Sequence, residues 1–152
     1  MKKALMTFFV LLLMEAMSMA QPLMVQDKNF DKFTRISVED KFVLKFYKAD
    51  SYYVKLKTDE RIAAHVQAYV KNGTLFLVLD EKGYSSDLKK ELRQKGATDP
   101  VLEAEVYMPT FNSLVLEDKC TLVHSDLFST ETFTMTASDN SVVSQLNVAC
   151  ST

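Results

Sequence analysis

The side chains best suited to chemistry in this sequence are two histidines and two cysteines. They are His65, His124, Cys120 and Cys150. Cys120 and His124 stand four positions apart, but a zinc site needs three or four ligands. A Cys–His nucleophile also needs a third group that orients the base. No third group is visible near this pair, so we interpret both histidines as structural residues and predict no metal site and no cofactor.

Acidic residues offer a second chemistry, because some β-helix proteins cleave polysaccharides with paired carboxylates. Glu103 and Glu105 alternate onto one face of an expected strand, and Glu117 and Asp118 could extend the set. A glycosidase needs two carboxylates at a defined separation in a cleft, one of them with a raised pKa. Nothing in the pattern predicts a cleft. We therefore interpret these carboxylates as a solvated strand face and predict no catalytic residues.

Four tyrosines fall on the polar sides of their expected strands. They are Tyr47, Tyr53, Tyr69 and Tyr107. A row of exposed tyrosines on a rigid sheet could stack on sugars or anchor a partner, because Tyr offers a large contact area and a polar tip. The alternative is ordinary cross-strand pairing within a sheet. Both interpretations stay open, and these four residues form the candidate binding surface.

The elements that must position these residues are mostly strands. From Phe33 onward apolar and polar residues alternate with period two, which indicates half-buried β-strands. A hairpin is predicted over 65–79, because the Asn-Gly pair at 72–73 suits a type I′ turn. Alternation breaks at one short helix or loop excursion near 86–95, whose charge run we interpret as a solvated face. Pro109 ends the strand that carries Tyr107, since proline cannot donate to a ladder.

An internal repeat follows Pro109. The segment LVLEDKCTLVHSDLFSTET, from Leu114, aligns without a gap over FTMTASDNSVVSQLNVACS, from Phe133. Short strand–turn–strand repeats are typical of β-solenoids, in which each coil buries its apolar face against the next. The predicted fold is therefore all-β, with antiparallel hairpin strands before a β-solenoid-like stack of short strands with coils of about 19 residues.

The N-terminus has the anatomy of a bacterial secretory signal. Two lysines precede an apolar run from Ala4 to Met14. Ser18 and Ala20 are small residues at the positions that a signal peptidase recognises before its cleavage site. The run is too short for a membrane span, which needs ~20 apolar residues. We expect cleavage after Ala20. The predicted organisation is a signal peptide at 1–20, a polar N-terminal segment at 21–32 and a single β domain at 33–152.

Charge and cysteine usage restrict the possible partners. The net charge is −2, with both signs interspersed, which argues against nucleic acid as a partner. The expected location is the periplasm or the outer cell surface, with no transmembrane segment in the mature chain.

A disulfide is permitted in either of these locations. In the register of the repeat, however, Cys120 falls on Asp139 and Cys150 on Glu131, so we expect no disulfide between these different corners.

Three segments together resemble a known family. They are FTRISVEDKFVLKFYK from Phe33, VQAYVKNGTLFLVLDEK from Val66 and VLEAEVYMPTFNSLVLED from Val101. They resemble the putative auto-transporter adhesin head domain of the GIN type, found in exported proteins of Gram-negative bacteria. The resemblance implies a β-solenoid-like envelope domain and supplies no catalytic residues. Turns in that family are usually Gly-rich, whereas the repeat here predicts corners at Lys119-Cys120 and Asp139-Asn140.

Three functions stay open at this point. The first is an exported, non-enzymatic, adhesin-like module that binds a glycan or an envelope protein. The second is an envelope scaffold with no ligand of its own, and the least favoured is a polysaccharide-active enzyme.

Members of the family run on for further coils, whereas this sequence stops between coils at QLNVACST. We expect a truncated end that self-associates through its uncapped edge, which a monodisperse monomer would contradict.

Overall fold

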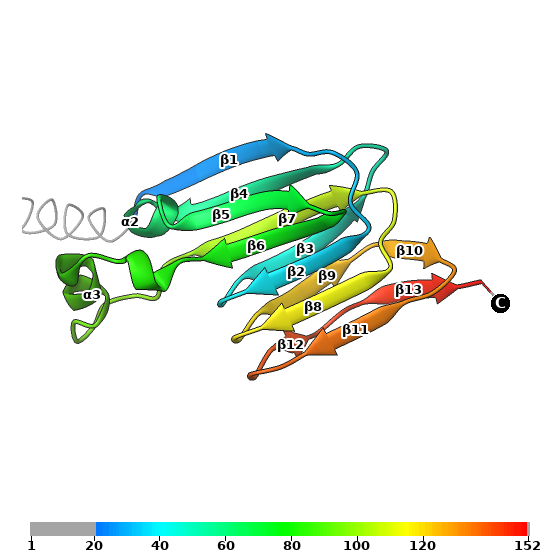
Figure 1. Cartoon of the computed structure of the whole chain (residues 1–152). Helices are drawn as coiled ribbons and strands as arrows, with labels where there is room; N and C mark the ends of the chain where they lie inside the picture. The colour runs from blue at the N-terminus through cyan, green and yellow to red at the C-terminus, as the bar shows by residue number, and fades with distance from the viewer. Residues whose placement is uncertain (1–20, 152) are drawn as a thin grey trace, which may run out of the picture.

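The computed structural model describes residues 21–151, which form two β-sheets packed face to face (Figure 1). The predicted signal peptide lies outside the described residues. Sheet A has six strands, in the order β1 (Leu23–Asn29), β4 (Tyr53–Asp59), β7 (Leu102–Met108), β3 (Val43–Lys48), β9 (Thr121–Ser125) and β12 (Val142–Val143). Sheet B has five strands, in the order β11 (Thr134–Ala137), β8 (Ser113–Glu117), β2 (Arg35–Glu39), β6 (Thr74–Leu79) and β5 (Val66–Lys71). A separate parallel pair is formed by β10 (Leu127–Thr130) and β13 (Asn147–Cys150).

A single apolar core fills the space between the two sheets. The alternating residues of β7, β8, β3 and β6 are buried, as the period-two pattern predicted. Phe111 packs edge-to-face against Phe46 and Phe128, with ring centroids 5.4 and 5.0 Å apart. The five phenylalanines that are fully buried in this core are Phe33, Phe42, Phe46, Phe111 and Phe128.

The predicted hairpin and the predicted excursion are both confirmed. Strands β5 and β6 pair antiparallel around Asn72 and Gly73, whose φ angles of 51° and 72° are those of a type I′ turn. The excursion contains η1 (Glu81–Gly83) and α3 (Ser86–Leu92), and the Ser85 hydroxyl caps α3 by accepting a hydrogen bond from the Leu88 amide. No helix among residues 21–151 has the length and hydropathy to cross a bilayer.

The N-terminal polar segment predicted at 21–32 contains a strand. Within it, β1 pairs antiparallel with β4 along its whole length, from Leu23 opposite Asp59 to Asn29 opposite Tyr53. Because β1 lies at the edge of sheet A and most of its side chains are exposed, its sequence shows no apolar alternation. Backbone hydrogen bonds to β4 hold this segment, and they leave no sequence pattern.

The internal repeat is real, but its predicted register is wrong. Leu114 of β8 pairs with Met135 of β11 rather than with Phe133, so the offset is 21 residues. The parallel pairing continues from β9 to β12 and from β8 to β2, so short arches stack on one another. Antiparallel strands β1, β4 and β5 complete the sheets. The sheets are therefore mixed, and they do not form the clear β-solenoid that the repeat predicted.

Three two-residue corners carry the chain from sheet B to sheet A. Both residues of each corner have positive φ: Asp40-Lys41, Asp118-Lys119 and Asp139-Asn140. The corners stack, because the Lys41 amide donates to the Asp118 carbonyl at 2.8 Å and the Lys119 amide to the Asp139 carbonyl at 3.0 Å. The predicted Lys119-Cys120 corner is thus wrong by one residue. Asp and Asn tolerate the left-handed region, whereas lysine is strained there.

A buried ion pair anchors the short helix α2 (Glu60–Ala63) and, through it, α3. Asp59 is almost fully buried and accepts the Arg61 amide at 2.9 Å as the N-cap of α2. The Arg61 guanidinium donates to both carboxylate oxygens of Asp59, and this contact holds the pKa of Asp59 below its usual range. Arg61 also reaches Glu91 of α3 at 3.3 Å, so one guanidinium fixes both helices.

Replacing Lys119 with glycine is expected to raise the free energy of unfolding by about 0.5–1 kcal/mol. Relief of the left-handed strain, roughly 1–2 kcal/mol, exceeds the roughly 0.5–1 kcal/mol entropic cost of glycine. The matched control is Asn140→Gly, which should gain less because Asn already tolerates positive φ. Urea unfolding measures both. Destabilisation by Lys119→Gly would contradict the assigned corner.

Replacing Arg61 with methionine is expected to cost about 3 kcal/mol at pH 7, because it leaves the Asp59 carboxylate buried and unpaired. The lowered pKa of Asp59 means that the stability from this pair is present above about pH 4 and is lost as the pH falls through the folded-state pKa. The loss caused by Arg61→Met should therefore shrink in acid. The exposed pair of Lys57 and Glu103 gives the control, Lys57→Met, with an expected cost below about 1 kcal/mol. Thermal and urea unfolding measure both variants. If Arg61→Met and Lys57→Met lost the same free energy of unfolding, Asp59 would not be held as a buried ion.

Candidate functional site

Three of the four predicted tyrosines lie side by side on the outer face of sheet A. Tyr53 of β4 and Tyr47 of β3 are the Cα partners of Tyr107 on β7, one from each side. The rings of Tyr53 and Tyr107 stack at 4.1 Å with 7° between their planes, and those of Tyr107 and Tyr47 stack at 5.0 Å with 22°. His124 of β9 continues the row at 5.0 Å from Tyr47. We call these four residues the aromatic ladder.

The stacking decides how the aromatic ladder can contact a ligand. Tyr107 has a ring on each side, so neither of its faces is free to stack on a sugar. Only the two end members, Tyr53 and His124, keep a ring face that no other ladder member covers. The interior rings offer their edges and hydroxyl groups instead. The sequence left cross-strand pairing and ligand stacking open, and the structure shows cross-strand pairing in the interior of the ladder.

A row of alternating charge runs beside the aromatic ladder. Glu105 of β7 lies opposite Lys55 of β4 and Lys45 of β3. The Tyr107 hydroxyl donates to the Glu105 carboxylate at 2.9 Å. Burial, and then this hydrogen bond and the carboxylate charge, raise the pKa of Tyr107 well above its usual value, so its phenol stays protonated. The outer face of sheet A thus combines aromatic edges with fixed charges of both signs.

His124 reaches the ladder because of a β-bulge that the sequence does not reveal. Leu44 of β3 pairs with Leu122, but the next residue, Lys45, pairs with His124, so Val123 is an extra residue in β9. A bulge re-aims the side chains that follow it. The Nε2 atom of His124 also lies 3.2 Å from a carboxylate oxygen of Asp126. His124, which the sequence indicated to be structural, therefore lies within the candidate surface.

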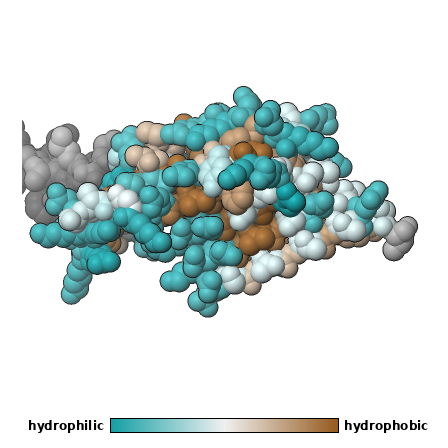
Figure 2. All heavy atoms as spheres, viewed as in Figure 1, coloured by the Kyte–Doolittle hydropathy of each residue, from teal (hydrophilic) through white to brown (hydrophobic). Residues whose placement is uncertain are grey.

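Tyr69 does not belong to the aromatic ladder. It lies on β5 of sheet B, is 41% exposed and stacks on Phe76 of β6 at 5.1 Å. On the face of the molecule drawn in Figure 2, apolar side chains gather in the middle and hydrophilic side chains surround them. The carboxylates that the sequence placed on one strand face also lie on different sheets. Glu117 is on β8 of sheet B, whereas Glu103 and Glu105 are on β7 of sheet A. The prediction that Glu117 extends that set is therefore wrong.

The cysteines do not form a reactive pair. Cys120 is fully buried, and its thiol donates to the Glu117 carbonyl at 2.9 Å. Burial raises the pKa of Cys120 to about 11, so the thiol is protonated at neutral pH. Cys150 is exposed, and the two cysteines do not form a disulfide with each other. Among residues 21–151, no three His, Cys, Asp or Glu side chains are placed to hold a metal ion.

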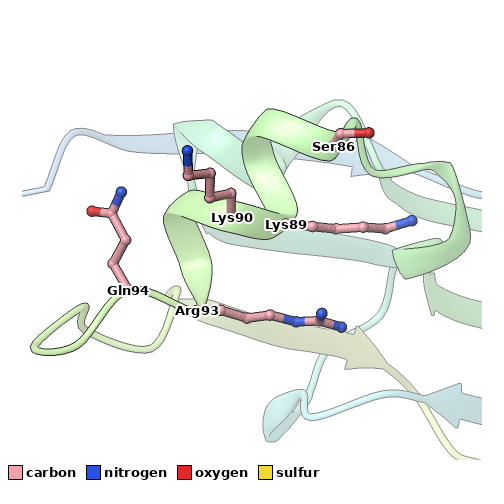
Figure 3. A pocket seen from close by; sticks show the side chains of 5 residues that line it. All are labelled: Ser86, Lys89, Lys90, Arg93 and Gln94. Carbon is pink, nitrogen blue, oxygen red and sulfur yellow. The ribbon is translucent and has the colours of Figure 1, made fainter.

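Helix α3 presents a shallow basic depression of about 540 Å³ (Figure 3). In that view Lys89 and Arg93 extend in the same direction, whereas Lys90 and Gln94 point elsewhere. The residues that line the depression are Ser86, Lys89, Lys90, Arg93 and Gln94. All five side chains are exposed, so this depression is open to solvent.

The strands and their pairing define an all-β domain with two large mixed sheets. Residues 32–151 match the family described as "Putative auto-transporter adhesin, head GIN domain", and the chain belongs to that family. The resemblance that the sequence segments indicated is thereby confirmed. A comparison with curated proteins finds no match.

Solved structures show the same fold at low sequence identity. A putative adhesin from Bacteroides fragilis NCTC 9343 is 15% identical with a TM-score of 0.62, over 85% of this chain and 56% of that one. A putative adhesin from Parabacteroides distasonis ATCC 8503 is 14% identical with a TM-score of 0.63, and the match covers 80% of this chain and 47% of that one. A protein from the same strain that is described as a putative lipid binding protein is 11% identical with a TM-score of 0.56. That match covers 76% of this chain and 46% of the other. This chain spans about half the length of these structures.

Tyr107→Ala is expected to lower the free energy of unfolding by about 2–3 kcal/mol, because it removes two ring stacks and the buried area of the central ring. Tyr107→Phe keeps both stacks and should lose only about 1 kcal/mol with the hydrogen bond to Glu105. Tyr69→Ala is the matched control and removes one exposed stack. Urea unfolding of the three variants measures the differences. If Tyr69→Ala cost as much as Tyr107→Ala, the aromatic ladder would not be a cooperative element of sheet A.

Proposed function

We propose that this protein is an exported, non-enzymatic binding module of the adhesin type, and that the aromatic ladder is its contact surface. Membership of the adhesin head family supports the class of function. The observation that carries the proposal is the continuous row of Tyr53, Tyr107, Tyr47 and His124 across four strands. The partner would be a glycan or another protein of the cell envelope.

The geometry favours recognition by the edges of the rings. Sugars present hydroxyl groups that accept and donate hydrogen bonds, and the interior tyrosines present phenol groups on a rigid frame. Lys45, Lys55 and Glu105 flank them with charged donors and acceptors. The end ring of Tyr53 adds a face on which a sugar ring could stack. A surface of this kind discriminates partners by hydrogen-bond pattern more than by apolar area.

Export is the second part of the proposal. The N-terminal sequence MKKALMTFFVLLLMEAMSMA supports it, with cleavage after Ala20 and residence in the periplasm or on the outer cell surface. Membership of the family also supports an exported protein. N-terminal sequencing of protein recovered from the cell envelope tests it, and a cytoplasmic protein that retains Met1 would contradict it.

Binding to an array of bacterial and host glycans tests the contact surface. Tyr53→Ala and Tyr107→Phe should each weaken binding about tenfold, since each removes a stacking face or a hydrogen-bonding hydroxyl. Tyr69→Phe on sheet B is the matched control and should bind like the unaltered protein.

Two results would replace the proposal. Capture of an envelope partner that is insensitive to all three substitutions, without a glycan signal, would favour a scaffold. Hydrolysis of a polysaccharide that Glu105→Gln abolishes would establish an enzyme.

A further inference from the structure

A cavity of about 810 Å³ lies beneath the excursion that carries α3. It is placed where β3 and β7 begin, whereas Tyr47 and Tyr107 of the aromatic ladder lie near the ends of the same strands. Its volume is within the range of small-molecule sites, roughly 300–1,000 Å³. We call it the helix-edge cavity.

The inner part of the helix-edge cavity is apolar. The apolar surface that a ligand can reach comes from Val43 of β3, Leu92 of α3 and Val101, which are half-buried and lie above a fully buried base. Leu92 of α3 and Tyr84 of the excursion pack against the same core. Burial raises the pKa of Tyr84 to about 12, so this side chain adds a neutral phenol. An apolar surface of this kind accommodates a hydrocarbon chain.

The rim of the helix-edge cavity carries an excess of unpaired positive charge. Its acidic residues are Glu81, Glu103 and Asp99, of which Glu81 pairs with Lys41 at 3.0 Å and Glu103 with Lys57 at 3.8 Å. The cations that also line it are Lys89, Arg93 and Lys119, and in the described part of the chain none of them forms an ion pair.

Three cations from two separate parts of the chain therefore face one acidic residue, Asp99, that forms no ion pair within residues 21–151. Lys89 of α3 and Arg93, the C-cap of that helix, extend in the same direction (Figure 3). Lys119 comes from the corner between β8 and β9. The ion pair of Arg61 with Glu91 holds α3, so the backbone that carries Lys89 and Arg93 is in place before a ligand binds.

We propose that the helix-edge cavity binds an amphipathic anion with a single acyl chain. The acyl chain lies against Val43, Leu92 and Val101. The anionic group sits among Lys89, Arg93 and Lys119. Neither part of the site is sufficient alone, because exposed lysine and arginine side chains hold a free anion weakly. The two parts together match a carboxylate or phosphate group joined to a hydrocarbon tail.

Isothermal titration calorimetry of the whole chain with dodecyl phosphate, below its micellar concentration, tests the proposal. We expect saturable binding with one ligand per chain, and a loss of about tenfold or more in the double variant Lys89→Glu, Arg93→Glu. Lys90→Glu is the matched control, because Lys90 is on the same helix but does not line the cavity. Lys119→Glu, from the opposite side of the rim, should weaken binding even if the double variant fails to fold.

Probe chemistry separates the proposed ligand from its alternatives. Inorganic phosphate and dodecyltrimethylammonium should both bind at least tenfold more weakly than dodecyl phosphate, because one lacks the tail and the other has the wrong charge. Absence of saturable binding, equal binding of the cationic amphiphile, or equal effects of Lys90→Glu and Lys119→Glu would each overturn the proposal. Glycan binding at the aromatic ladder uses different residues, so either proposal can fail while the other stands.

Discussion

The structure depends on the stacking of its three left-handed corners. Each corner turns the chain from sheet B to sheet A in two residues, and both residues must adopt positive φ. Backbone hydrogen bonds from Lys41 to Asp118 and from Lys119 to Asp139 hold the corners in one column. Because the corners are aligned, the strands that follow them are in register. Inward residues therefore meet inward residues through the core, and outward residues form rows on the surface.

The candidate surface depends on a second register, that of β7 and β4 beside β3, which no left-handed corner sets. Tyr47 lies beside Tyr107 because β3 and β7 pair in parallel without a break, and Tyr53 joins them through the antiparallel pairing of β4. A slip of one residue would turn each tyrosine toward the core. The ring stacks then add pairwise energy to an arrangement that the backbone already fixes, which explains why the ladder spans four strands.

Sequence reasoning succeeded where the signal is local. Alternation placed the buried faces, the Asn-Gly pair placed the hairpin, and Pro109 ended β7. Strand order is not local, so the sequence could not show that Tyr69 lies on the other sheet. The register of the repeat was chosen by matching apolar residues, and it missed the stronger constraint that Asp118 must align with Asp139 at a corner. The bulge that brings His124 outward and the backbone pairing of β1 leave no residue pattern at all.

The two proposed sites share strands but not residues. Val43 and Glu103, near the starts of β3 and β7, line the helix-edge cavity, and Tyr47 and Tyr107 lie four residues further along the same two strands. Between them the strands are paired on both sides within sheet A, so neither site contains a segment that must unpair for a ligand to bind. Coupling between sites requires an element with two arrangements that both ligands bias. A continuous sheet supplies rigidity instead, so the two proposed sites are expected to bind their ligands independently.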